Sequence, residues 1–384
     1  MFQKYFLTLL SFLFFLKTFA QKETIHAINW SIATQLPTAD GLQKQSGLAG
    51  AISGIHHDVL LIAGGSNFKN NMPWEGGKKK YYNDVYVLQK DKKGQFSWKA
   101  NTYKLPYNLA YAAAASTPEG ILCAGGENES GVSNEVFLLK WNEEEQNISI
   151  VNLPNLPYAV TNTSATVLSH YIYLAGGEIA SGVSNAFLSF DLNDISAGWK
   201  QLPPLPQPTS HAVFLAENKS LFLVGGRKKN AGGISDLYQT LYEFNIDKNY
   251  WVEKSKLPYA LSAGTGLLLN SKDILLFGGD RGKTFHKVES LIAAIGVEKD
   301  EAKKQELNQQ KSQIQASHPG FSKEVLIYNI MTQKWSKLND ISVTVPVTTL
   351  ALLWGKDIII PCGETKARVR TPNILMGKIK PLKK

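Results

Sequence analysis

The residues from Glu364 to Arg370 have the most chemically suggestive spacing in the chain, because one acid is followed closely by Lys366, Arg368 and Arg370. A carboxylate that lies near cations and is partly removed from water can act as a general base. A guanidinium can bind another carboxylate through two parallel hydrogen bonds. The stretch therefore predicts a site for an acidic ligand. The alternative is a loop ion pair that contributes about 0 to 1 kcal/mol to stability.

This stretch is the last of six segments that follow a glycine pair or a degenerate copy of one. The pairs begin at Gly64, Gly125, Gly176, Gly225 and Gly278, and the sixth copy is Cys362-Gly363. Between them lies a second motif, a Trp followed by a Leu-Pro turn, as in Trp98 with Leu105-Pro106. Each unit contains four short runs that resemble strands. Such a period, near fifty residues, is typical of four-stranded propeller blades.

The N-terminal stretch from Trp30 to Pro37 carries the Trp motif but precedes every glycine pair. It is therefore expected to complete the last repeat, which ends at Lys384. Pairing the two ends in this way closes the ring and removes its open sheet edges. The sequence thus predicts an all-β, six-bladed propeller closed by the N-terminal strand, with residues 21–384 forming a single domain.

The fifth repeat is about thirty residues longer than the others, and the extra residues lie at about 285–320. They are rich in Glu, Lys, Gln and Ala, and the apolar positions Val288, Leu291, Ile292 and Ile295 have helical spacing. This pattern predicts one or two helices that cover one face as a partial lid. The alternative is a solvated excursion without function.

The loops after the second and fourth strands of a blade open on the same face of a propeller, where a ligand is expected. The segments after the glycine pairs bring Asn67, Lys78, Glu127, Glu178, Arg227, Asp280 and Glu364 to that face. The segments after the Leu-Pro turns bring Tyr111, Asn162, His211 and Ser262. A lone histidine such as His211 is more often a structural hydrogen-bonding group than a ligand contact.

The first twenty residues resemble a cleaved secretory signal, with Lys4, an apolar run from Phe6 to Leu16, and Ala20 before Gln21. Its removal would take away Lys4 and Lys17 and lower the formal net charge from +9 to +7. We therefore expect an exported protein in a periplasm-like space, with no membrane span after cleavage. The scattered positive charge favours a small anionic ligand over nucleic acid.

Cys123 and Cys362 are too few for a disulfide framework, and each lies at the end of an apolar strand, so both are expected to be free and buried. The sequence has no cluster with the spacing of metal ligands, no Gly-x-Ser-x-Gly nucleophile and no phosphate-binding glycine loop. No metal and no cofactor are therefore expected.

The glycine pairs and tryptophans resemble the kelch repeat, over about residues 28 to 380. Three stretches further resemble the N-acetylneuraminate epimerase, or sialic acid mutarotase, family. They are Gly363 to Lys366 with Arg370, the loop from Gly64 to Phe68 with Gly77-Lys78 and Tyr81, and the insertion after Gly278-Gly279. The Glu364 loop comes last and the Asn67 loop first, so the resemblance implies a circularly permuted order that leaves these loops adjacent in a closed ring.

The resemblance implies an isomerase that interconverts the anomers of N-acetylneuraminate without a cofactor, by opening and closing the sugar ring. Glu364 is then the base for the anomeric hydroxyl, and Arg370 binds the substrate carboxylate. Asn67, Lys78, Glu127 and Arg227 are supporting contacts. Arg368 competes with Arg370 for the carboxylate, and the sequence leaves that choice open.

Two other functions are considered. A non-catalytic kelch module could bind a glycan or a protein with the same face, because propellers support both enzymes and interaction modules. A copper-radical oxidase on a kelch scaffold is disfavoured, because its Tyr-Cys crosslink and histidine ligands would have to converge on one face, whereas the histidines of this chain are scattered. The oligomeric state and the residue that protonates the ring oxygen are left open.

Overall fold

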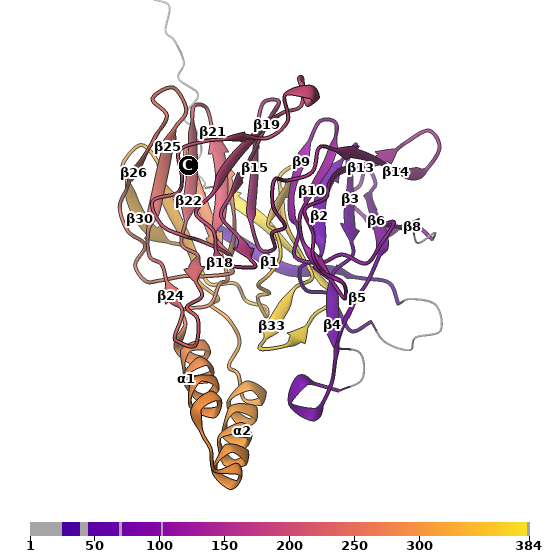
Figure 1. Cartoon of the computed structure of the whole chain (residues 1–384). Coiled ribbons are helices and arrows are strands. Elements are labelled where there is room, and N and C mark those ends of the chain that lie inside the picture. Colours follow the sequence, from indigo (N-terminus) through magenta and orange to yellow (C-terminus); the bar gives the residue numbers. More distant parts are fainter. Residues whose placement is uncertain (1–24, 39–44, 69–70, 101–102, 382–384) are drawn as a thin grey trace, which may run out of the picture.

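The computed structural model describes residues 25–38, 45–68, 71–100 and 103–381. The predicted signal at residues 1–20 lies outside these residues. Within them, six antiparallel sheets are arranged as blades around a ring (Figure 1). The chain is therefore a six-bladed β-propeller, as the repeat predicts.

The blades follow the chain in order, and the inner strand of each blade comes first except where the ring closes. The first three blades consist of β2 (Ile52–His56), β3 (Val59–Ala63), β6 (Asp84–Lys90) and β7 (Phe96–Trp98), with β8 (Tyr103–Lys104) also on β6; β9 (Ala113–Thr117), β10 (Gly120–Ala124), β13 (Val136–Asn142) and β14 (Asn147–Leu153); and β15 (Ser164–Leu168), β16 (Tyr171–Ala175), β19 (Phe187–Asp191) and β20 (Lys200–Gln201). The other three consist of β21 (Val213–Glu217), β22 (Ser220–Val224), β25 (Leu241–Asn245) and β26 (Tyr250–Glu253); β27 (Thr265–Leu269), β28 (Asp273–Phe277), β29 (Val325–Asn329) and β30 (Lys334–Lys337); and β31 (Leu352–Trp354), β32 (Asp357–Pro361), β35 (Asn373–Pro381) and β1 (Ile25–Gln35).

The ring closes where the outer strand β1 pairs with β35, which confirms the predicted role of the N-terminal strand. Trp30 lies opposite Gly377 in this pairing. A Cβ atom at Gly377 would lie 2.9 Å from the Trp30 ring, so a side chain there would displace the indole. The last blade is therefore assembled from both ends of the described chain.

The hydrophobic core is divided among the contacts between neighbouring blades. The second strands β3 and β10 are buried along their whole length and consist of continuous apolar runs. Six clusters of buried side chains form, and each joins two adjacent blades. The cluster with Trp30 and Phe277 joins the fifth blade to the sixth. Ring closure therefore completes the core as well as the hydrogen bonding.

The two sequence motifs also connect neighbouring blades. The Nε1 of Trp199 donates to the carbonyl of Pro154 in the preceding blade at 2.8 Å, so the indole packs without leaving a buried donor unpaired. The N–H of Gly65 donates to Leu109 at 2.8 Å. Gly64 has a φ of +64°, and a Cβ there would lie 2.1 Å from that same Leu109 carbonyl oxygen. The positive φ and the close approach together explain the glycine pairs.

One end of the ring carries the extensions between second and third strands. In five blades these extensions are short hairpins: β4 (Ser66–Phe68) with β5 (Lys79–Tyr81), β11 (Glu127–Asn128) with β12 (Gly131–Val132), β17 (Glu178–Ile179) with β18 (Gly182–Val183), β23 (Arg227–Lys228) with β24 (Asp236–Leu237), and β33 (Glu364–Lys366) with β34 (Val369–Arg370). Two 3₁₀ turns, Pro73–Glu75 and Ile195–Ala197, complete the described elements.

In the fifth blade the extension is a helical hairpin, α1 (Lys283–Val297) and α2 (Glu301–Ala316), and it starts slightly before the predicted limit of 285. Asp300 caps α2 by accepting a hydrogen bond from the N–H of Lys303 at 3.0 Å. The helices project from the same end of the ring as β4, β5 and β33 (Figure 1). We call this end the cavity face.

A closed ring of backbone hydrogen bonds lies just inside the cavity face. One residue of each blade donates its N–H to the carbonyl of the corresponding residue in the preceding blade, over distances of 2.8 to 3.3 Å. The six residues all have positive φ, and they are Gly50, Tyr111, Asn162, His211, Ala263 and Thr348. Ala263 takes the place in the ring where the sequence pattern points to Ser262. We call this feature the backbone ring.

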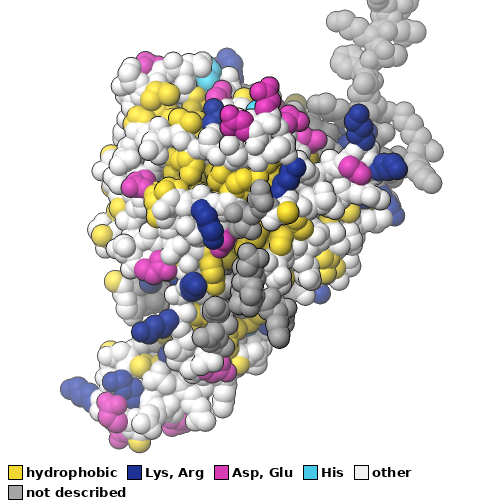
Figure 2. All heavy atoms as spheres, turned by 90° about the vertical axis from the view of Figure 1, so that its right-hand side faces the viewer, with side chains coloured by type: hydrophobic (Ala, Val, Ile, Leu, Met, Phe, Trp, Pro, Cys, Tyr) yellow, Lys and Arg dark blue, Asp and Glu magenta, His cyan; other side chains and the backbone are white. Residues whose placement is uncertain are grey.

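Other features of the chain agree with its composition. Cys123 and Cys362 are buried free thiols, as predicted, and burial raises the pKa of both. No described helix combines the length and the apolar character needed to span a bilayer. On the side of the ring formed by the first blades, the described basic and acidic side chains are intermixed with hydrophobic ones (Figure 2).

Candidate active site

A cavity of about 450 Å³ opens at the cavity face. Tyr111, Asn162, His211, Ala263 and Thr348 of the backbone ring lie at its inner end, where they also line a narrower space of about 140 Å³ in the channel beyond. Its walls come from the hairpins and from the helical insertion. Most charged side chains predicted for the site line it, and they are Glu127, Glu178, Arg227, Asp280, Glu364 and Arg368.

Glu364 lies at the start of β33, and its carboxylate is fixed from two sides. The Nη1 of Arg370 lies 2.9 Å from Oε2, and the backbone N–H of Arg368 donates to Oε1 at 3.0 Å. The Arg370 contact is an ion pair without hydrogen-bond alignment, since Nη1 and Nε have no aligned acceptor among the described atoms. The Glu364 side chain is 17% exposed and the Arg370 side chain only 2%. The carboxylate thus faces the cavity, with the guanidinium behind it.

The two arginines of this hairpin occupy different positions. Arg370 is covered by Phe68, whose ring centroid lies 5.0 Å from the guanidinium carbon. Arg368 is exposed and lines the cavity, with φ of +67° at the turn of the hairpin. Its guanidinium has no ion-pair partner among the described residues. Of these two arginines, only Arg368 is therefore free to bind a ligand carboxylate in this arrangement.

Tyr111 connects the first hairpin with the last. Its hydroxyl lies 3.4 Å from Nη2 of Arg370 and 3.0 Å from Oγ of Ser66. Its ring lies beneath Nζ of Lys79, at 5.0 Å from the centroid. The predicted adjacency of the first and last loops is therefore present in the structure.

The lysine of the first loop that lines the cavity is Lys79, while Lys78 lies in an outer hollow. Lys79 and Tyr81 both reach Glu127 Oε1, at 2.9 and 2.7 Å. Burial lowers the pKa of Lys79, but Tyr111 and Glu127 outweigh it and the pKa is raised. Burial and the bond to Glu127 raise the pKa of Tyr81 to about 12. This pair therefore remains a lysine cation and a neutral phenol.

Asn67 points away from the cavity. It is 3% exposed, its Nδ2 donates to the carbonyl of Gly47 at 2.9 Å, and its Oδ1 accepts from the hydroxyl of Tyr82 at 2.8 Å. Because side chains alternate along a strand, its neighbours Ser66 and Phe68 are the ones that contact Tyr111 and Arg370. Asn67 therefore stabilises the hairpin, with both ends of its amide bonded within the protein, and its contact with a ligand stays a prediction.

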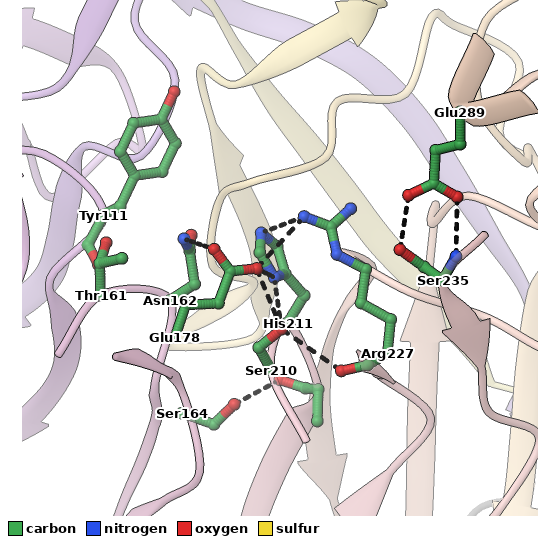
Figure 3. Close-up of polar contacts among 11 residues, drawn as sticks. Tyr111, Thr161, Asn162, Ser164, Glu178, Ser210, His211, Arg227, Ser235 and Glu289 are labelled. Carbon is green, nitrogen blue, oxygen red and sulfur yellow. Dashed lines mark hydrogen bonds and ion pairs between the residues drawn. The ribbon is translucent and has the colours of Figure 1, made fainter. Parts of the chain in front are cut away.

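The third and fourth blades contribute a second acid–arginine pair, shown in Figure 3. Glu178 Oε1 accepts from Oγ of Ser210 at 3.2 Å and lies 3.5 Å from Nη2 of Arg227, and Oε2 accepts from Nδ2 of Asn162 at 3.4 Å. The side chains of Arg227 and Glu178 are 20% and 25% exposed. The Glu178 carboxylate is thus surrounded by hydrogen-bond donors.

His211 belongs to the same cluster. Burial, together with the nearby Arg227 charge, holds its pKa well below the usual 6.5. Because a guanidinium can only donate, Nε2 of His211 must accept from Arg227 Nη2 at 3.3 Å, and the proton is therefore on Nδ1. Nδ1 lies 3.1 Å from Ser210 Oγ and 3.5 Å from Glu178 Oε1. Because the His211 imidazole is neutral, its contact with Glu178 is a polar contact and not an ion pair.

The helical insertion supplies one wall of the cavity. Phe285 of α1 stacks on Arg227, with the guanidinium carbon 4.9 Å from the ring centroid. Glu289 accepts from the N–H of Ser235 at 2.9 Å and from its hydroxyl at 2.5 Å, which attaches α1 to the fourth blade (Figure 3). His318, after α2, also lines the cavity, and burial lowers its pKa. The insertion is helical, as predicted, and it forms one wall of the cavity while its helices project outward from the cavity face (Figure 1).

Among the described residues, no group of three or more His, Cys, Asp and Glu side chains is arranged to hold a metal ion. The side chains that line the cavity include carboxylates, cations, a phenol and imidazoles.

Comparison with known proteins identifies the family. A family model described as N-acetylneuraminate epimerase matches residues 17–148 and 153–383 of this chain. The chain belongs to the N-acetylneuraminate epimerase family. This confirms the resemblance seen in the loops around Glu364 and Phe68.

Individual family members share only parts of the sequence. The N-acetylneuraminate epimerase of Brucella melitensis is 40% identical over 126 residues, which cover 30% of this chain and 31% of that protein. The Haemophilus influenzae (strain PittEE) protein of the same name is 27% identical over 231 residues, 59% of each chain. The matched parts of this chain thus span 31% and 59% of these two relatives.

A solved structure shares the fold of the epimerase family chain. The structure described as "Structure of YjhT" superposes with a TM-score of 0.62 at 15% identity, covering 91% of this chain and all of the other. That likeness establishes the propeller architecture. The circularly permuted blade order is untested by these matches and stays a prediction.

Sequence patterns miss several residues of this family member's cavity. Lys79, Ser210, Phe285 and His318 line the cavity or contact residues that do, and none follows directly from the repeat. The alternation of side chains in the β5 strand is the signal that favours Lys79 and Tyr81 as a pair on one face. The predicted contacts at Glu127, Arg227, Glu364 and Arg368 all lie on the cavity wall.

Proposed function

We propose that this chain interconverts the α and β anomers of N-acetylneuraminate by acid–base ring opening and closure. Family membership supports the substrate, an acidic sugar with a carboxylate on its anomeric carbon. One observation supports the chemistry: the Glu364 carboxylate faces a cavity of about 450 Å³ while Arg370 and the Arg368 N–H fix it from behind.

Glu364 is proposed as the base that takes the proton of the anomeric hydroxyl. Its carboxylate accepts a single aligned hydrogen bond from the described residues, so lone pairs remain for the substrate. The reaction is slow but spontaneous, and general base help of about 10²- to 10⁴-fold is sufficient for a useful catalyst.

The substrate carboxylate is proposed to bind Arg368, with Lys79 and Arg227 as further cations of the wall. Arg368 is exposed in the cavity, whereas Arg370 is 2% exposed and lies behind Glu364. This choice gives the two arginines separate roles, with Arg370 as a positioning residue. Lys79 takes the role that the sequence pattern assigned to Lys78.

The test follows anomeric equilibration directly by NMR. A sialidase releases α-N-acetylneuraminate in the tube, and the rate of conversion to the β anomer is measured with and without the purified chain. Faster equilibration supports the proposal. Binding without acceleration would instead support the non-catalytic glycan-binding module. If the chain neither binds N-acetylneuraminate nor accelerates its equilibration, the sialic acid assignment is wrong.

We also propose that the protein is exported and cleaved after residue 20. The basic and apolar pattern of the first twenty residues supports this proposal. Sequencing the N-terminus of the protein recovered from a periplasmic extract tests it, and an intact Met1 in that fraction would contradict cleavage.

A further inference from the structure

Ring opening of a cyclic sugar requires two proton transfers, and the proposed function assigns only one. Glu364 removes a proton from the anomeric hydroxyl, while the ring oxygen must gain one as its bond to the anomeric carbon breaks. These two oxygens are attached to the same carbon, so the acid and the base must lie close together on the cavity wall. The following inference therefore rests on the proposed function.

Arg370 holds a phenol beside the Glu364 carboxylate. Its Nη1 lies 2.9 Å from Glu364 Oε2, and its Nη2 lies 3.4 Å from the hydroxyl of Tyr111. The two nitrogens belong to one planar group, so the carboxylate and the phenol are neighbours on the same wall. Both side chains line the cavity, and the guanidinium between them is buried.

The hydrogen bonds of Tyr111 leave its own proton available. Ser66 Oγ donates to the Tyr111 hydroxyl at 3.0 Å, and Arg370 donates from the other side. With both contacts used as donors to the phenol oxygen, its O–H can donate to a ligand. The backbone ring fixes the Tyr111 backbone, because its N–H donates to Gly50 and its carbonyl accepts from Asn162.

Other proton carriers on the wall are less suitable. Lys79 is bonded to Glu127 at 2.9 Å. His211 accepts at Nε2 from Arg227 and directs Nδ1 toward Ser210 and Glu178, so neither nitrogen is free to donate into the cavity. His318 is the main rival, because its Nδ1 accepts from the N–H of Gly320, which leaves a proton on Nε2.

We infer that Tyr111 is the general acid that protonates the ring oxygen while Glu364 deprotonates the anomeric hydroxyl. The electron pair of the anomeric O–H bond forms the C=O bond of the open-chain keto acid. The electron pair of the bond between the anomeric carbon and the ring oxygen stays on the ring oxygen, which receives the Tyr111 proton. After the keto group rotates, the phenolate takes the proton back as that oxygen attacks the opposite face, and Glu364 returns its proton to the carbonyl oxygen. Arg370 and Lys79 are the cations nearest to the transient phenolate.

The first experiment compares Tyr111→Phe with wild type in the NMR equilibration assay. Phenylalanine keeps the ring beneath Lys79 and removes only the hydroxyl. We expect kcat to fall about 10²- to 10⁴-fold, with the affinity for N-acetylneuraminate, measured by calorimetry, nearly unchanged. Tyr238→Phe is the matched control, because it removes a hydroxyl that donates to Pro208 outside the cavity, and its rate should equal that of wild type.

The outcomes separate this inference from the proposed function. Wild type that fails to accelerate equilibration overturns both. Wild type that accelerates together with an equally active Tyr111→Phe overturns only the role of Tyr111. A much slower His318→Gln beside a fast Tyr111→Phe would transfer the role to His318.

A second measurement covers the case in which Tyr111→Phe does not fold. A fluorinated tyrosine at position 111 keeps every hydrogen bond, but its phenol gives up a proton at lower pH than an ordinary phenol. We expect the alkaline arm of the kcat–pH profile to move to lower pH. An alkaline arm that stays in place would overturn the inference, since a purely structural tyrosine would not move it.

Discussion

The sixth blade and the third and fourth blades each present a glutamate and an arginine to the same cavity, but the pairs are built differently. In the sixth blade the arginine is 2% exposed and lies behind its glutamate. In the other pair the side chains are similarly exposed, at 20% and 25%, and Phe285 stacks on Arg227. Figure 3 shows how many polar groups surround Glu178 in that second pair.

The difference indicates which carboxylate can do chemistry. Glu178 accepts from Ser210, Arg227 and Asn162, so its lone pairs are largely occupied. Within the described part of the chain, Glu364 accepts one aligned hydrogen bond, from the backbone of Arg368. A carboxylate with free lone pairs can take a proton from a ligand, whereas one surrounded by donors stabilises the arrangement of the wall.

The largest difference in rate is expected between the variants in which Glu364 or Glu178 is exchanged for glutamine. Glu364→Gln should reduce kcat for mutarotation by about 10²- to 10⁴-fold, because the base is lost. Glu178→Gln should reduce it by less than tenfold. The NMR assay measures both variants, and Asp280→Asn controls for the loss of any cavity carboxylate. A slow Glu178→Gln beside a fast Glu364→Gln would reverse the comparison.

The arginines of the sixth blade should separate binding from positioning. Arg368→Met should raise KM about 10- to 100-fold, the equivalent of losing a charge-assisted hydrogen bond of about 1.5 to 3 kcal/mol. Arg370→Met should instead lower kcat and the unfolding free energy, because Glu364 loses its buried partner. Steady-state kinetics and urea unfolding of the two variants check this. A KM effect confined to Arg370→Met would exchange the two roles.

The cluster of Glu178, Arg227 and His211 should affect how the free energy of unfolding changes at acid pH. The folded-state pKa of His211 is depressed, so the unfolded chain binds the proton more readily, and stability present above pH 6.5 is lost as the pH falls below it. We expect His211→Asn to lose less stability than wild type between pH 7.5 and pH 5. Asparagine also tolerates the positive φ at this position.

Thermal unfolding at several pH values measures the acid effect. His170→Asn is the control, since that side chain is 35% exposed and lies in the turn between β15 and β16. Parallel curves for wild type and His211→Asn would show that His211 is not the source of acid sensitivity.

The smallest effect is expected from the contact between α1 and Arg227. Phe285→Ala removes a cation–π contact of about 0.5 to 1 kcal/mol, which corresponds to a rise in KM of about two- to fivefold. Val297→Ala on the same helix is the control, because Val297 is 80% exposed. Equal KM values for the two variants would mean that the α1 wall does not contribute to ligand binding.

Much of the fold could be predicted because each motif meets a local requirement of backbone conformation or packing. The glycine pairs are required where a blade meets the next one, as at Gly64 and Leu109. Trp30 marks the closing strand because its indole packs at the contact between the last two blades. Such local requirements recur with the repeat, so they are visible in one sequence.

The site was only partly predictable, because it depends on side-chain direction and on contacts between blades. Lys78 and Lys79 differ by one position, but Lys79 begins strand β5 and lines the cavity, whereas Lys78 precedes that strand. The cluster of Glu178, Ser210 and His211 joins residues from two blades. No spacing within a single repeat reports such a contact. Glu364 could be predicted from the sequence because its own hairpin supplies both of its partners.

The backbone ring has an electrostatic consequence for the cavity. Each peptide group carries a dipole of about 3.5 D. Each of the six hydrogen bonds joins the N–H of one peptide group to the carbonyl of another, and together they follow a circle, so the components of these dipoles along the bonds largely cancel. The six N–H groups are directed along the ring toward the neighbouring carbonyls, so they do not converge on the channel axis as they would at a helix terminus. The floor of the cavity is therefore nearly neutral toward an anion. The preference for charge must come from the side chains of the wall, which is where substitutions can change it.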